Sequence, residues 1–106
     1  MPFYLWQASY TAEGAKGLLK EGGTKRRAAA QKLCESVGGK MHAFYYAFGK
    51  SDIVSIVEFP DHASASSASL AVVSTGVVTV HSTVLLTPED VDAAVKKSPT
   101  YRPPGA

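Results

Sequence analysis

The sequence predicts one α+β domain, in which four strands form an antiparallel sheet and helices cover one face of it. Apolar runs rich in β-branched and aromatic residues alternate with segments whose apolar residues recur every three or four positions. The turn Gly49–Asp52 joins the two central runs as a hairpin, where a glycine can take a positive φ and an aspartate can bond turn amides. The resulting β-α-β-β-α-β order is the ferredoxin-like arrangement.

Size and composition set wide limits on function. At 106 residues the chain fits one domain, expected over residues 1–98, followed by a flexible Pro-rich tail over 99–106. A net charge of +2 is too small to indicate a nucleic-acid or membrane partner. The single cysteine, Cys34, excludes an intrachain disulfide and favours the cytoplasm. We expect no signal peptide and no membrane span, since no apolar run approaches about 20 residues.

The first half of the chain predicts a strand and two helical segments. Phe3–Tyr10 reads as a strand, and Thr11 is a good helix N-cap. Residues 11–23 contain four glycines, each costing about 1 kcal/mol against alanine, so we expect a weak helix or an ordered loop. Thr24 then resembles the N-cap of a firmer helix, ended by Gly38-Gly39. One face of that helix carries Ala30, Leu33, Cys34 and Val37.

The second half predicts the hairpin, a helix, a strand and a last helix. Strands are expected over residues 40–48 and 53–59, and the second should lie inside the sheet because both its faces are apolar. Asp61 caps a helix of small residues, although its Ser and Ala content also suits a flexible linker. Residues 77–86 form the fourth strand. Thr87-Pro88-Glu89 then begins a short helix through Lys97.

Helices on one side leave the other side of the sheet bare. The strands offer that side too many apolar residues for contact with water. A second copy of the chain is the simplest cover, so we expect a homodimer or a higher homo-oligomer.

Motifs spread over most of the chain resemble a known family. They comprise Tyr10-Thr11 with Gly14, Gly38-Gly39-Lys40 with Phe44-Tyr45, Gly49 with Asp52, and Val54, Glu58 and Pro60-Asp61. Together they are similar to the GYD domain family of small bacterial and archaeal proteins. The family has an aromatic residue directly before the aspartate, whereas this chain has Ser51 before Asp52.

This resemblance implies a fold and no reaction. It indicates a dimeric α/β barrel, and the family has no established activity. Related barrels include cofactor-free oxygenases, lactone isomerases, haem enzymes and effector domains of regulators, so a borrowed reaction is fold-level analogy alone.

The candidate ligand-binding residues are His81, Gln7, Tyr45 and Glu58. His81 shares one face of the fourth strand with threonines, while valines fill the other face. If the valines meet the helices, His81 lies on the bare face, where a dimer would enclose it. There it could bind or deprotonate a small ligand, or form a hydrogen bond across the dimer interface. Which faces of the first and second strands join His81 stays open, and His81 is the one candidate catalytic residue.

Other polar residues receive simpler interpretations. His42 and His62 are expected at the surface, and no histidine spacing indicates a metal site. Asp52 should form the turn, at about 20 Å from Glu58, which is too far for a paired acid and base. Glu58 is then a satisfied edge carboxylate or a pocket base.

Two further features concern anions and redox chemistry. Lys25-Arg26-Arg27 lies in the first turn of a helix and could attract an anion, or simply be solvated. Cys34 lies in an apolar stripe, so we expect it to be buried and inert. No motif for a cofactor or a nucleotide is present.

Three hypotheses of function follow. The first is a homo-oligomeric domain that binds or interacts through its open sheet face. The second is a barrel-type enzyme, similar to an isomerase or a cofactor-free oxygenase, acting on a small organic substrate with His81 as base and a nearby tyrosine. The third is a regulatory protein that binds an acidic molecule at Lys25–Arg27.

Overall fold

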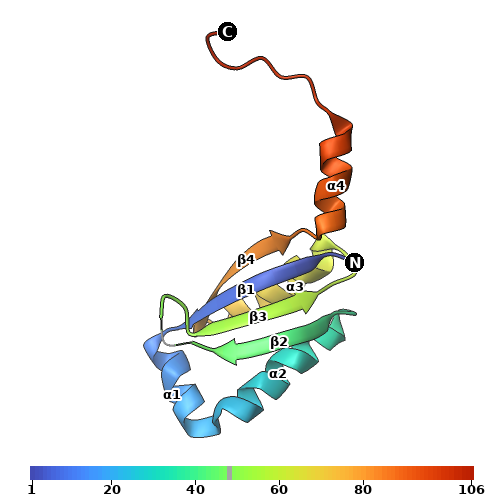
Figure 1. Ribbon diagram of the computed structural model, residues 1–106. Coiled ribbons are helices and arrows are strands. Elements are labelled where there is room, and N and C mark those ends of the chain that lie inside the picture. Colours follow the sequence, from blue (N-terminus) through green and yellow to red (C-terminus); the bar gives the residue numbers. More distant parts are fainter. Residues whose placement is uncertain (48) are drawn as a thin grey trace.

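The computed structural model describes residues 1–47 and 49–106, and its elements follow the predicted order (Figure 1). Phe48, which was predicted to end the second strand, lies outside the described residues. The elements are β1 (Phe3–Tyr10), α1 (Ala12–Glu21), α2 (Gly23–Ser36), β2 (Lys40–Tyr46), β3 (Ile53–Glu58), α3 (His62–Val73), β4 (Val78–Leu85) and α4 (Pro88–Lys97).

The four strands form one antiparallel sheet in the order β2-β3-β1-β4. This order confirms the ferredoxin-like α+β prediction, and it confirms that β3 lies inside the sheet. Helices α2 and α3 pack against one face, and the other face carries no helix among the described elements (Figure 1).

The core lies between that sheet face and the two helices. Val57, Phe59 and Cys34 are its most deeply buried side chains. The rings of Tyr4 and Trp6 lie 5.9 and 5.4 Å from the Phe59 ring, within the range of favourable aromatic contacts. The small residues predicted for the second covering helix form a helix, and its Ala65 and Ala68 are buried in this core.

The helix caps agree with prediction at three of four places. The hydroxyl of Thr11 accepts from the Gly14 amide, the carboxylate of Asp61 accepts from the Ser64 amide, and Thr87 begins a capping box with a proline behind it. The Ser64 amide bond lowers the pKa of Asp61.

The prediction was wrong at the start of the second helix. Gly22, not Thr24, is its N-cap, and it takes a φ of 87° that suits glycine. The same residue ends α1, which is a ten-residue helix in spite of its glycines. One residue therefore serves both helix ends, because its positive φ turns the chain between them.

Strand β2 ends at Tyr46 and β3 begins at Ile53, and the Ala47 amide donates to the Asp52 carbonyl at 2.8 Å. Among turn residues 49–51, which the structure describes, Asp52 bonds no amide through its side chain. Its Oδ2 accepts from the Tyr10 amide at 2.8 Å, and its own amide donates to the Ala8 carbonyl at 2.8 Å. Asp52 thereby fastens the hairpin end to β1, a long-range role that turn propensities do not indicate.

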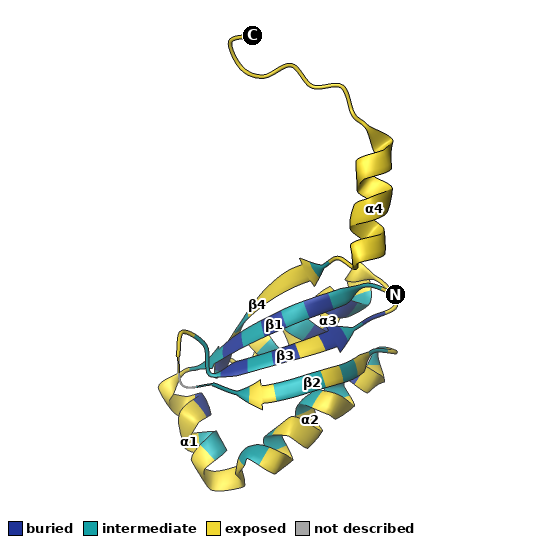
Figure 2. Cartoon of the chain, viewed as in Figure 1, coloured by how far each residue is buried: buried dark blue, intermediate teal, exposed yellow. Residues whose placement is uncertain are grey.

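The last helix leaves the body of the domain, and none of its residues is buried (Figure 2). The radius of gyration is 17.0 Å, whereas a compact domain of this length has about 13 Å. Val91 and Val95 lie one turn apart on α4 and are 47% and 71% exposed. The helix therefore carries an apolar stripe that this chain itself leaves uncovered.

Two kinds of site are absent from residues 1–47 and 49–106. No helix there combines the length and apolar character needed to cross a bilayer. No three histidine, cysteine or acidic side chains there gather as metal ligands.

We predict that Gly14→Ala and Gly17→Ala shift stability in opposite directions. A Cβ at Gly14 would lie 2.1 Å from the Val77 carbonyl oxygen, whereas one at Gly17 meets nothing within 4 Å. Alanine favours a helix by up to about 1 kcal/mol, and overpacking costs about 1–3 kcal/mol. Urea unfolding should show Gly17→Ala stabilised and Gly14→Ala destabilised. Equal changes in the free energy of unfolding of the two variants would contradict the close approach of α1 to the Val77 carbonyl.

We also predict that Cys34 is inert in the folded protein. Its side chain is fully buried, and burial, followed by the neighbouring Glu35 charge, raises its pKa to about 11. At pH 8 an aromatic disulfide reagent should label it only after urea unfolding. Labelling at the same rate in native protein and in urea would show that the helix does not cover it.

Candidate functional site

The uncovered face of the sheet, here called the open face, carries all four candidate ligand-binding residues. Side chains alternate along a strand, and Tyr4, Trp6 and Ala8 of β1 face the helices. Gln7 therefore lies on the open face, and the register extends this face across the sheet. The open face consists of Phe3, Leu5, Gln7, Ser9, Lys40, Ala43, Tyr45, Val54, Ile56, Glu58, Thr79, His81, Thr83 and Leu85.

Three of the four predicted ligand-binding residues form one row across this face. Tyr45 is opposite Val54, Val54 is opposite Gln7, and Gln7 is opposite His81. This answers which strand faces join His81: Gln7 and Tyr45 do, and Trp6 does not. Since β2 and β4 are the outer strands, Tyr45 and His81 lie about 14 Å apart, three strand spacings. Gln7 is the nearest polar neighbour of His81 in the row.

Glu58, the fourth predicted residue, lies on the same face and has a partner. Its Oε1 is 2.8 Å from Nε2 of His42, and the His42 ring lies 5.0 Å from the ring of Phe3. The register shifts between Met41 and Ala43, and this irregularity adds His42 to the strand. The structure therefore makes Glu58 a paired carboxylate.

His62 is exposed, as predicted, but it also has a partner. Its Nδ1 is 2.5 Å from the hydroxyl of Tyr4, which crosses from the core to the first turn of α3. Burial, with a contribution from the Asp61 charge, raises the pKa of that tyrosine. The pair links β1 to α3 and does not reach the open face.

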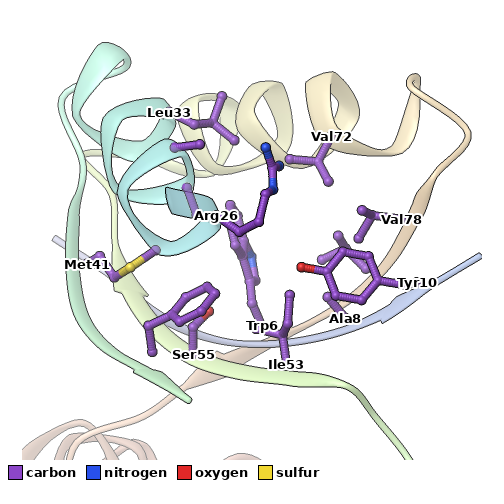
Figure 3. Close-up of a pocket in the computed structure, with 14 residues that line it drawn as sticks. Trp6, Ala8, Tyr10, Arg26, Leu33, Met41, Ile53, Ser55, Val72 and Val78 are labelled. Atoms are coloured by element: carbon purple, nitrogen blue, oxygen red, sulfur yellow. The ribbon is translucent and has the colours of Figure 1, made fainter. Parts of the chain in front are cut away.

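The three cations at the start of α2 separate in the structure. Lys25 and Arg27 are exposed, whereas Arg26 is partly buried and pairs with Glu21 at 3.4 Å. Arg26 lines a cavity on the helix side of the sheet, as Figure 3 shows. Of the cationic run, predicted as an anion site or as a solvated run, Arg26 lines the cavity while Lys25 and Arg27 stay at the surface.

That cavity, here called the interlayer cavity, has a volume of about 120 Å³ and lies between α2, α3 and the sheet. Its lining is mostly apolar, with Trp6, Phe44 and Ile53 from the strands. Tyr10 directs its hydroxyl inward, toward Arg26 (Figure 3). Burial and the neighbouring Tyr46 raise the pKa of Tyr10, while Arg26 acts in the opposite direction.

Sequence reasoning missed this cavity and the pairing of His42 with Glu58. A signal existed for the second: the core-facing apolar residues of β2 change from odd to even sequence positions between Met41 and Phe44, as they do at a bulge. The cavity left a weaker signal, a stretch of three alanines after the cations of α2.

A family model described as the GYD domain matches residues 4–95. Comparison with curated proteins and with solved structures gave no match.

Proposed function

The chain belongs to the GYD domain family, and on this premise we propose that it works as a homodimer in which two copies cover each other's open face. The observation that carries the proposal is the apolar centre of this face, where Leu5, Val54 and Ile56 lie side by side on the two inner strands. Ile56 is 36% exposed although its strand is internal. Apolar surface of this kind is characteristic of an interaction site.

Charge favours a second copy as the occupant. The strands contain one acid and one lysine, Glu58 and Lys40, which are opposite each other in the ladder. Glu58 is also paired with His42. A two-fold axis brings identical patches together, so a strongly charged face would repel its own copy. The charges on the open face balance, so the open faces of two copies can pack against each other without repulsion.

The unpartnered helix α4 supports the same interpretation. A ten-residue helix is marginal in water by itself, so its stripe of Val91 and Val95 needs a surface to pack on. The open face measures roughly 20 by 25 Å from strand spacing and rise, less than the roughly 800 Å² per partner of a stable interface. In the proposed dimer, α4 of each copy packs on the surface of the other copy. This contact supplies the buried area that the open face lacks.

The row of Tyr45, Gln7 and His81 would then line the interface and any small organic ligand held there. The enzyme alternative is less well supported, because Tyr45 lies about 14 Å from His81 within one chain. Glu58 is committed to His42 and is not opposite His81. Binding through the face therefore fits the geometry better than acid–base catalysis by these residues.

The cytoplasm is part of the same proposal. Its support is the single cysteine, Cys34, which is a buried free thiol and forms no crosslink.

We predict that Ile56→Arg separates the dimer. It would place two like charges in the apolar centre of the interface, at a cost of about 2 kcal/mol or more in association. The matched control is Leu19→Arg, because Leu19 is 86% exposed on α1, away from this face. Sedimentation at micromolar concentration should give twice the 11.2 kDa mass of one chain for the wild type and for the control.

The Ile56→Arg protein should sediment as a single chain with an unchanged thermal melt at low concentration. A wild-type protein that sediments as a monomer would overturn the proposal. So would dissociation of the Leu19→Arg protein to the same extent.

A further inference from the structure

We propose that the interlayer cavity binds a small apolar monocarboxylate of about the size of benzoate, with Arg26 holding its carboxylate. This site is on the helix side of the sheet, so it is separate from the open face and does not depend on the proposed dimer. Trp6, Phe44 and Ile53 would surround the apolar part of the ligand.

The cavity exists because small side chains face it from above. Ala29 and Ala30 of α2 line it on one side and Val72 of α3 on the other, over a floor of larger strand residues. Interiors normally fill such space with side chains. Such a mostly apolar lining suits a hydrocarbon group better than it suits water.

Arg26 lies at the mouth of the cavity. It lines the cavity and also a surface groove between α2 and α3, and it shares both with Leu33, Val72 and Val78. Figure 3 shows the side chain extending between Leu33 and Val72. An acid entering between the two helices would pass its apolar end inward and leave its carboxylate beside the guanidinium.

The guanidinium can accept such a ligand. Arginine has five donors and stays charged, and planar carboxylates suit its fork. Glu21 contacts only Nη1, at 3.4 Å, and both side chains of that pair are about two-fifths exposed. A pair of this kind contributes little, about 0–1 kcal/mol, so a ligand carboxylate can replace it. The Tyr10 hydroxyl, directed toward Arg26, offers a further donor.

Size limits the ligand. An apolar cavity of about 150 Å³ holds benzene, and this one has about 120 Å³. Because the cavity is somewhat smaller than that, a single ring or a short branched chain is the largest group it could take, and the carboxylate must remain at the mouth. Long-chain acids and nucleotides exceed the space.

The test uses Trp6, the single tryptophan of the chain, which lines the cavity and reports on its contents. Benzoate is titrated into the full-length protein while tryptophan fluorescence is recorded, and calorimetry confirms the dissociation constant. Benzoate should bind saturably, whereas benzamide, its neutral analogue of the same shape, should bind at least about tenfold more weakly, because a charged hydrogen bond is lost.

Variants separate the site from the overall charge. Arg26→Gln should weaken benzoate binding by about tenfold or more. Lys25→Gln removes the same charge from the neighbouring exposed residue. It should change the dissociation constant of benzoate by less than about twofold, since exposed charges are screened. Equal losses in the two variants, or equal binding of benzamide, would overturn the proposal.

A second variant tests the cavity itself. Ala30→Leu fills the space without removing the cation, so benzoate should no longer bind, while the thermal melt stays the same or rises. Wild-type binding by a folded Ala30→Leu protein would place benzoate elsewhere and overturn the proposal. Absence of any saturable benzoate signal in the wild type at millimolar concentration would do so as well.

Discussion

The alternation of side chains along β1 is the constraint on which the rest of this structure depends. Tyr4, Trp6 and Ala8 point to the helices and form the floor of the core, so Gln7 and its neighbours must point the other way. Because β1 is paired on both sides, a shift by one residue would reverse both faces at once. The core, the open face and the interlayer cavity all follow from this register.

The sequence was sufficient to predict most of the fold, because the spacing of apolar residues and the helix-capping residues are local signals. β1 was predicted with its observed ends, and the caps at Thr11, Asp61 and Thr87 are the residues that satisfy helix amides. The shared face of Gln7, Tyr45 and His81 needed the register as well, since each strand alone leaves two choices of face.

Other features could not be predicted, because they depend on contacts between distant residues. Asp52 resembles a turn former in sequence, yet it holds the Tyr10 amide, 42 positions away. Arg26 resembles one member of a solvated run, and only the packing of α2 directs it inward. Such roles arise when helices settle on the sheet, and no local pattern records them.

The residues that carry the family resemblance have structural roles here. Gly14 gives α1 its close approach to the Val77 carbonyl, and Gly39 leaves room for the Phe59 ring, which a Cβ would meet at 2.6 Å. Asp52 joins the hairpin to β1, and Asp61 caps α3. These motifs specify the scaffold, so family membership conveys a fold and not a reaction. The lining of the interlayer cavity draws mostly on other residues, Arg26 among them, and this is where the chemistry particular to this chain should be sought.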